Sequence, residues 1–178
     1  MNNFSVKKDG KVYWVSRSMA VTGFVFKRIG LKMFVLVNKR GEGAPDFKHH
    51  WNCPCGYLDY NETTKEAVSR EVREETGIDI TPQRFIFTTY RDNPETENRQ
   101  NVTFRFYAVL SKNEGNTFSL DESEENEVEE VKWIEVKNVQ NYLFAFNHSK
   151  AIKEVYKNYK LKIWLKSFLT DIIYLLKR

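Results

Sequence analysis

Apolar and polar residues alternate along several short stretches of the chain, which is the pattern of strands with one buried face. The clearest stretch is 102–110, where every second residue from Val102 to Leu110 is apolar. Runs rich in Val, Phe and Leu predict strands at 19–27 and 33–39, and Gly30 between them predicts a hairpin. By the same criteria, further strands are expected at 12–16, 84–91 and 129–136.

Two other stretches follow the helical period. In the first, 64–76, Val68 and Val72 form an apolar stripe, Thr63 or Thr64 can act as N-cap, and Gly77 is a C-cap signal. The second begins at Asn138 and extends to about residue 159, and it allows a break near His148. Strands on both sides of one central helix, followed by a C-terminal helix, predict an α/β/α sandwich with a mixed sheet.

Beyond residue 160 an apolar stripe continues at helical spacing. Its members are Leu161, Leu165, Phe168, Leu169, Ile172 and Leu176. We therefore predict a domain of residues 1–160 and an amphipathic C-terminal helix of residues 161–178. We expect the stripe to pack on the domain or on a partner subunit in a homodimer, and an anionic membrane surface is the alternative.

Charge is unevenly distributed between these parts. Residues 151–178 contain seven Lys or Arg and two Asp or Glu, whereas the first 150 residues contain 21 and 22. A body that is not basic makes nucleic acid an unlikely general partner. The chain has no apolar run of 18 residues, lacks a signal-peptide pattern at its start, and has two cysteines too close for an ordinary disulfide, so we predict no membrane span and a cytoplasmic location.

Three carboxylates stand at i, i+3 and i+4 in the first predicted helix, on one face: Glu71, Glu74 and Glu75. Like charges at these spacings oppose helix formation unless something neutralises them. A hard divalent cation such as Mg²⁺ or Mn²⁺ prefers oxygen ligands and would do so. Arg70 precedes Glu74 by four residues and can hold the array in place.

The stretch from Gly56 to Ile78, GYLDYNETTKEAVSREVREETGI, resembles the Nudix box, GX5EX7REUXEEXGU with U aliphatic, at every defined position. The resemblance implies a Nudix hydrolase with the Nudix α/β/α sandwich fold. It also implies magnesium, or manganese, held by Glu71, Glu74 and Glu75, and a water that attacks phosphorus. Arg70 and Glu62 would hold these metal ligands in place without binding the metal themselves.

The resemblance extends to two positions outside the glutamate array. Cys55 stands where the family often has a glycine whose carbonyl helps to bind metal, so we include it among the metal candidates. The family also often recruits a glutamate from a loop before a late tryptophan strand. In the loop DESEENEVEEVKW, Glu124, Glu125 and Glu127 qualify, and we choose Glu127, six residues before Trp133, as metal ligand or general base. Glu74 and Glu75 remain alternatives for the base.

For substrate binding we select Arg91 and Arg99, because arginine suits phosphate, Tyr57, which can stack on a base, and Glu62. The resemblance implies hydrolysis of a diphosphate linkage in a nucleotide, specifically in a nucleoside diphosphate linked to a second group, X. Pro94, sixteen residues beyond Ile78, resembles the ADP-ribose-cleaving branch and favours a nucleotide sugar.

Several alternatives stay open. They are hydrolysis of damaged nucleoside triphosphates, removal of pyrophosphate from RNA 5′ ends, and a non-catalytic regulator that senses a nucleotide sugar. A zinc site formed by four nearby side chains is disfavoured, because their spacing departs from the usual paired motifs. These side chains are His49, His50, Cys53 and Cys55.

Overall fold

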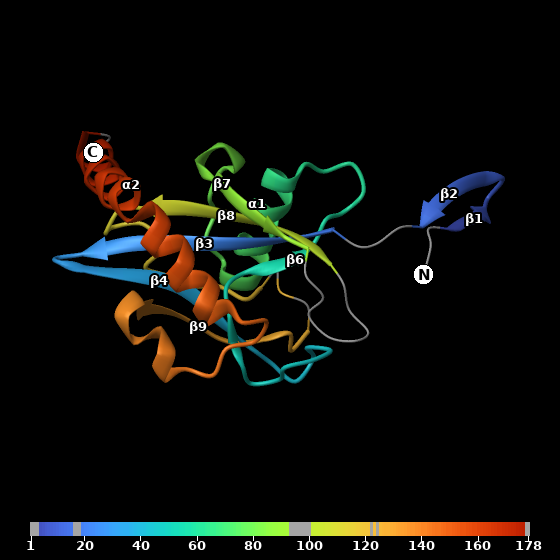
Figure 1. The fold of residues 1–178 in the computed structure, drawn as a ribbon, viewed down its shortest axis with the longest axis horizontal. Coiled ribbons are helices and arrows are strands. Elements are labelled where there is room, and N and C mark those ends of the chain that lie inside the picture. Colours follow the sequence, from blue (N-terminus) through green and yellow to red (C-terminus); the bar gives the residue numbers. More distant parts are fainter. Residues whose placement is uncertain (1–3, 16–18, 93–100, 122, 124, 177–178) are drawn as a thin grey trace.

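A long central strand, β3 (Met19–Ile29), organises the sheet in this computed structural model (Figure 1). The structure describes residues 4–15, 19–92, 101–121, 123 and 125–176. Strand β8 (Val102–Leu110) pairs with β3 in parallel from Met19 to Lys27. On its other side, β3 pairs antiparallel with β6 (Cys55–Tyr57) near its start and with β4 (Lys32–Arg40) near its end.

The remaining strands extend this sheet in both directions. Strand β7 (Ile86–Arg91) pairs with β8, and both β5 (Trp51–Asn52) and β9 (Val128–Glu135) pair with β4, which completes a seven-stranded mixed sheet. Strands β1 (Phe4–Lys8) and β2 (Lys11–Val15) form a separate two-stranded sheet. Two short 3-10 helices, η1 (Pro82–Arg84) and η2 (Val136–Asn141), follow helix α1 (Thr64–Thr76) and strand β9 respectively.

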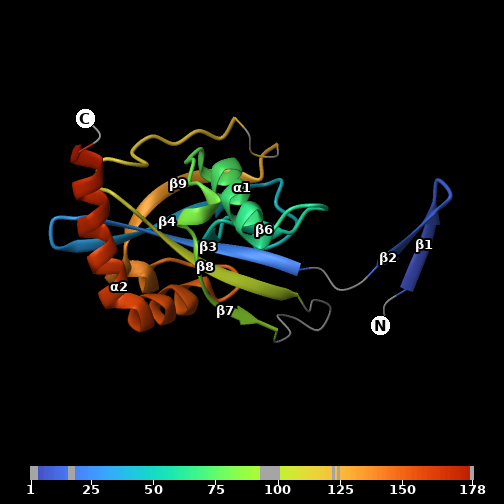
Figure 2. The same cartoon turned by 90° about the horizontal axis from the view of Figure 1, so that it is seen from above.

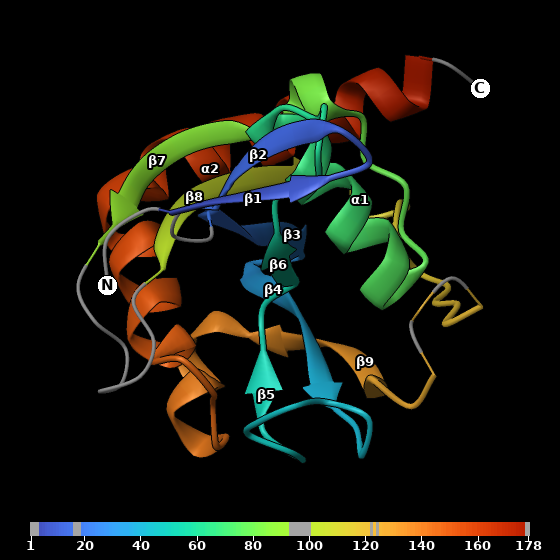
Figure 3. The same cartoon turned by 90° about the vertical axis from the view of Figure 1, so that its right-hand side faces the viewer.

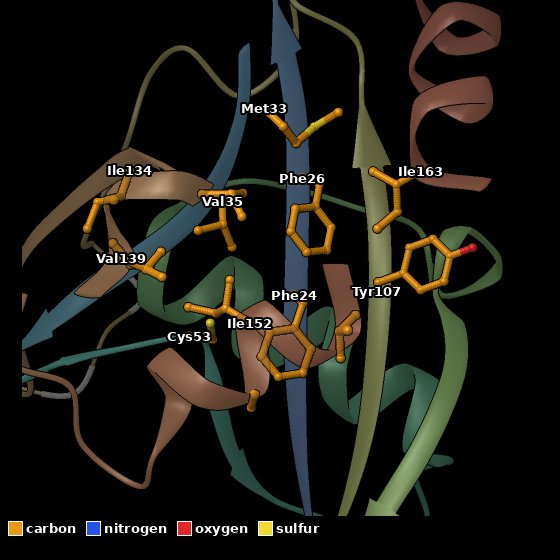
Figure 4. Packing of buried hydrophobic residues seen from close by; sticks show 14 of the residues in the cluster. Phe24, Phe26, Met33, Val35, Cys53, Tyr107, Ile134, Val139, Ile152 and Ile163 are labelled. Carbon is orange, nitrogen blue, oxygen red and sulfur yellow. The ribbon is translucent and has the colours of Figure 1, made fainter. Parts of the chain in front are cut away.

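Each face of the sheet is covered by one helix, as Figure 2 shows. Alternation along β3 turns Val21 and Val25 towards α1 (Thr64–Thr76), and turns Phe24 and Phe26 towards α2 (His148–Leu176). Figure 4 shows the hydrophobic cluster between the sheet and α2, in which Ile152 and Ile163 of α2 pack near the two phenylalanines. The predicted α/β/α sandwich with a mixed sheet and a C-terminal helix is therefore confirmed.

A glycine in β3 sets how closely α1 can approach the sheet. A Cβ at Gly23 would come within 3.0 Å of Val68 and 3.1 Å of Val72, the two apolar residues of the helix that face the sheet. The side chains of Val68 and Val72 therefore fill the space that a side chain at position 23 would need. This contact brings α1, with its acidic residues, close to the strand.

The ends of α1 follow the predicted signals. Thr63 is the N-cap, and Glu66 completes a capping box with it. At the other end Gly77 adopts a left-handed conformation, with φ at 71°, and its N–H donates to the Arg73 carbonyl. Local sequence therefore determines where the acidic helix begins and ends.

The C-terminal region departs from the prediction. The helical pattern expected from Asn138 is interrupted: η2 ends at Asn141, and α2 begins only at His148. From there α2 is continuous to Leu176, so the predicted domain boundary at residue 160 falls inside one helix. In the described part of the chain, no helix has the length and apolarity needed to cross a membrane.

The expectation that the C-terminal apolar stripe packs on the domain is wrong. Its six residues are all exposed: Leu161, Leu165, Phe168, Leu169, Ile172 and Leu176. The body instead contacts the opposite side of the helix through Ile163 and Ser167, both buried, and through Asp171, which pairs with Arg28 at 2.7 Å. Helical periodicity identifies a stripe, but the position of Arg28 on β3 decides which side faces inward.

This orientation can be tested by a pair of substitutions in α2. Ile163→Ala should lower the free energy of unfolding by about 2–5 kcal/mol, because it leaves a cavity in the core. Leu165→Ala, two residues away on the exposed side, should change it by less than about 0.5 kcal/mol. Urea unfolding of both variants measures the difference, and equal losses would contradict the observed orientation.

Candidate active site

Helix α1 lies beside β6 (Figure 3). At this junction Arg70 forms the centre of a network of carboxylates. Its Nη1 donates to Glu71 Oε1 at 2.9 Å and to Glu74 Oε2 at 3.0 Å. Its Nε and Nη2 donate to the two oxygens of Glu62 at 3.1 and 2.7 Å, and Nη2 also reaches the Tyr57 carbonyl. One guanidinium therefore ties three acids and the β6 backbone together.

Gly56 has no side chain where the network needs space. A Cβ at this position would overlap the carboxylate of Glu71. Because Gly56 pairs with Val21 of β3, this close approach joins the acidic face of α1 to the central strand. A larger residue at this position would displace the Glu71 carboxylate.

Two of the carboxylates are held in an environment that disfavours their charge. Burial raises the pKa of Glu71 to about 7, with Arg70 opposing the shift. Burial also raises the pKa of Glu75 well above its usual value, and the negative charges of Glu71 and Glu127 add to the effect. Glu75 Oε2 accepts the backbone N–H of Cys55 at 3.1 Å. A bound cation would offset the cost of burial and favour the charged forms of both groups.

Glu127 reaches the same site from the loop before β9. Its carbonyl accepts the Gly41 N–H at 2.7 Å, which fixes the loop, and its charge raises the pKa of both Glu71 and Glu75. Glu125 is exposed, and Glu124 lies outside the described residues. The structure thus brings Glu127 beside the box glutamates, as predicted from its spacing to Trp133.

The donor set fits a hard divalent cation, because it consists of carboxylate oxygens and backbone carbonyls around a buried junction. Within the described ranges, no three acidic, His or Cys side chains already converge as a cation site. Arg70 draws Glu71 and Glu74 to itself, while Glu75 turns to the Cys55 amide. Glu71, Glu74 and Glu75, with the carbonyl of Cys55 and Glu127, are the residues that could hold the ion.

The four side chains considered for zinc have other partners or lie apart. His49 bridges Glu42 and Glu129 at 3.0 and 2.8 Å on the surface, and the His50 ring meets the Lys48 carbonyl. Both cysteines are free, and burial raises the pKa of each thiol. Their surroundings therefore favour neutral thiols over the thiolates that zinc requires.

A cleft of about 160 Å³, partly open to solvent, adjoins the carboxylate network. It runs over the start of β3 and is bordered by segments distant in sequence. Besides Ala20–Thr22, Cys55, Gly56 and Glu127, its lining includes Arg40, Pro45, Asp46, Tyr57, Asn101, Thr103, Phe146 and His148. The cleft is large enough for part of a nucleotide-sized ligand beside the acids.

His148, the first residue of α2, is a neutral polar group on the cleft wall. Burial lowers the pKa of His148 to about 3, and the charges of Arg105, Arg91 and Arg40 act in the same direction. Its Nδ1 accepts the Cys53 N–H at 3.1 Å. Because a neutral imidazole carries one proton, Nε2 must be the protonated nitrogen, so the ring can donate one hydrogen bond.

The residues predicted to bind substrate lie in different positions relative to the cleft. Tyr57 lines the cleft, whereas Glu62 is not among the lining residues and binds Arg70 and the Asp59 N–H, so its contact with substrate stays a prediction. Arg91 ends β7 and acts on His148 through its charge but is not among the lining residues. Arg99, like Pro94, falls outside the described residues.

Sequence reasoning missed several lining residues. Arg40, Asn101, Phe146 and His148 carry no local motif, and they meet only because β4, β8 and α2 converge at this end of the sheet. Positive φ values at Phe146 and Asn147, 53° and 59°, mark the tight turn that delivers His148. The sequence signal for this turn is an Asn followed by a His just before a helical pattern.

Comparison with known proteins gives one family. The model described as NUDIX domain matches residues 16–157. An 8-oxo-dGTP diphosphatase of Proteus vulgaris is 38% identical over 65 residues, which cover 36% of this chain and 54% of that enzyme. Phosphatase NudJ of Escherichia coli K12 is 56% identical over 36 residues, which cover 20% of this chain and 24% of that protein. The chain therefore aligns with about half or less of these relatives.

Solved structures share the fold at lower identity. The NUDIX domain of Shewanella oneidensis NrtR, complexed with ADP ribose, superposes with a TM-score of 0.68 at 20% identity, covering 81% of this chain and 89% of that one. Longer NrtR complexed with a 27mer DNA matches with a TM-score of 0.65 at 21% identity, covering 81% of this chain and 63% of that one. At these identities the likeness concerns the fold alone.

The network around Arg70 makes a stability prediction. Arg70→Lys keeps the charge but cannot contact Glu62 in a fork while also reaching Glu71 and Glu74. We expect it to lower the free energy of unfolding by about 1–3 kcal/mol, the scale of hydrogen bonds to charged groups. Arg73→Lys, an exposed position on the same helix, is the matched control. Equal stability of the two variants in urea would contradict the role of Arg70.

Proposed function

The chain belongs to the Nudix family, and from this premise we propose that it is a divalent-cation-dependent hydrolase of diphosphate linkages. Its substrate would be a nucleoside diphosphate linked to a second group. One observation carries the proposal: Glu71, held by Arg70, and Glu75, held by the Cys55 N–H, are buried against β6, and Cys55 and Gly56 of β6 line a cleft that also contains Glu127. Burying a carboxylate costs free energy, so the burial of acids at the edge of a cleft supports a role for them in binding a ligand.

In the proposed hydrolysis the site residues have separate roles. Arg70 holds Glu71 and Glu74 in place, and the Cys55 amide holds Glu75. Glu127, Glu74 or Glu75 takes a proton from the attacking water as its oxygen bonds to phosphorus and the bridging oxygen leaves. Tyr57 and Phe146 offer aromatic surfaces to the rest of the nucleotide.

The cation is proposed from the chemistry of the donors. Carboxylates and a backbone carbonyl suit Mg²⁺, and Mn²⁺ is the alternative. When bound by these residues, the ion would neutralise diphosphate charge and make water a better nucleophile. In its absence, burial disfavours the charged forms of both acids and raises the pKa values of Glu71 and Glu75.

Conservative substitutions test the carboxylates. Glu74→Gln and Glu75→Gln retain size but remove a charged oxygen ligand, and we expect each to reduce turnover by at least about 100-fold at saturating magnesium. Glu130→Gln, at an exposed position of β9, is the control and should keep full activity. Far-ultraviolet circular dichroism should be unchanged in all three. Near-full activity of both Glu74→Gln and Glu75→Gln would exclude the box as the catalytic site.

For the substrate we propose ADP-ribose or a similar nucleotide sugar. The near-neutral body of the chain argues against a polyanionic nucleic acid, and the fold resembles a domain solved with ADP ribose. The Proteus relative, named an 8-oxo-dGTP diphosphatase, supports the alternative of a nucleoside triphosphate. The basic C-terminal segment supports RNA 5′ ends as the third option.

A substrate panel separates these options. ADP-ribose, other nucleotide sugars, nucleoside triphosphates and triphosphorylated RNA are each incubated with enzyme and magnesium, and the products are resolved by chromatography. We expect kcat/KM to be highest for a nucleotide sugar. A higher value for a triphosphate or for RNA would reject this substrate class while leaving the hydrolase proposal intact.

A second candidate is a sensor that binds a nucleotide sugar without cleaving it. The likeness to NrtR, solved with ADP ribose and with DNA, favours it. The complete glutamate array beside the cleft favours the enzyme, because a sensor needs no cation-binding acids for hydrolysis. Saturable binding of ADP-ribose with no turnover of any compound in the panel would select the sensor.

A further inference from the structure

The C-terminal half of α2 presents a broad apolar surface to solvent. We call it the α2 apolar face, and its members are Leu161, Leu165, Phe168, Leu169, Ile172, Ile173, Leu175 and Leu176. Their exposed fractions range from 48% at Phe168 to 81% at Leu176. Single exposed apolar residues are normal on a protein, but a continuous surface of this kind usually marks an interaction site.

The body of the protein holds this face outward. Ile163 and Ser167, on the opposite side of α2, are buried. Arg28 of β3 pairs with Asp171 at 2.7 Å and stacks on Phe168 at 4.1 Å, and the Lys112 N–H donates to Asp171 at 2.8 Å. The segment is therefore a docked helix whose outer side lacks cover, and not a free tail.

The charge around the face is positive. Lys153, Lys157, Lys160 and Lys162 are exposed on the preceding turns and at its edge. The two acids of residues 151–178 are already paired, Glu154 with Arg105 at 3.8 Å and Asp171 with Arg28. An apolar surface beside unneutralised lysines is complementary to a partner that is apolar inside and negative outside.

We propose that the α2 apolar face docks on the surface of an anionic lipid bilayer. Leu, Ile and Phe side chains would enter the boundary between headgroups and acyl chains, while the lysines contact lipid phosphates. The segment from Leu161 to Leu176 is about 24 Å long, which suits a helix lying in the plane of the interface. The attraction has both components that interfacial helices use, buried apolar area and charge.

A second copy of this chain fits the same face less well. Two copies joined across it would bring their lysines together, and the segment has no acid to pair with them, because Asp171 is bound to Arg28. Like charges across an interface oppose association. Anionic lipids supply the missing counter-charge in any arrangement.

Docking at this face leaves the cleft accessible. The cleft lies over Ala20–Thr22, at the start of β3, whereas Arg28, which contacts the face, stands near the end of that strand. The two sites thus occupy opposite ends of β3, as Figure 1 shows for β6 and the end of α2. The proposal is therefore independent of the enzymatic activity proposed above.

Vesicle flotation of the full chain tests the proposal. One set of vesicles contains phosphatidylcholine alone, and the other contains equal amounts of phosphatidylcholine and phosphatidylglycerol. We expect binding to the anionic vesicles to be at least about tenfold stronger, and to weaken as salt is added. The double variant Leu165→Ser with Ile172→Ser should lose this binding, as should Lys157→Glu with Lys162→Glu. Leu143→Ser, an exposed apolar position outside the helix, should bind like the parent chain.

Two further measurements keep the result interpretable. Melting temperatures of all variants should match the parent within error, because every changed residue is exposed. Sedimentation velocity should give a monomer. Equal binding to both vesicle types, no binding to either, or a dimer that Leu165→Ser with Ile172→Ser dissociates would each overturn the proposal.

Discussion

The guanidinium of Arg70 carries the constraint on which this site depends. Three glutamates on one face of α1 repel each other, and burial of Glu71 and Glu75 adds to the cost. Arg70 offsets part of that cost by binding Glu62, Glu71 and Glu74 together, and its contact with the Tyr57 carbonyl attaches the group to β6. The remaining imbalance supports the proposed cation site, because a fully neutralised array would gain little from binding a cation.

Strand β3 turns this local arrangement into a functional surface. Gly23 lets α1 approach the sheet, and Val21 pairs with Gly56 so that the Glu71 carboxylate sits against β6. Near its end the same strand carries Arg28, which pairs with Asp171 and contacts Phe168 in the C-terminal half of α2. A single element therefore positions the acids at one end of the molecule and an uncovered apolar helix face at the other.

The parts that could be predicted from sequence are those specified locally. The box helix, its Thr63 and Gly77 caps and the acids at i, i+3 and i+4 follow from neighbouring residues, as does the strand at 102–110. The cleft could not be predicted, because His148 and Phe146 join it through the packing of α2 across the sheet. The buried side of α2 could not be predicted either. Ser167 is buried and accepts a hydrogen bond from Arg28, whereas the leucines on the other side of the helix are exposed, so hydropathy alone indicates the wrong side.

The cleft is electrostatically divided, and this division bears on how a nucleotide would be oriented. Glu127 lines one wall, and Glu71 and Glu75 lie against Gly56 and Cys55 of the same wall, so we expect a diphosphate to bind there together with a cation. At His148, the charges of Arg40, Arg91 and Arg105 favour the neutral ring, which can donate a hydrogen bond to an uncharged acceptor. A ligand with the diphosphate at one end and neutral polar groups at the other satisfies both walls in a single orientation. A compound charged along its whole length would meet one wall with the wrong sign.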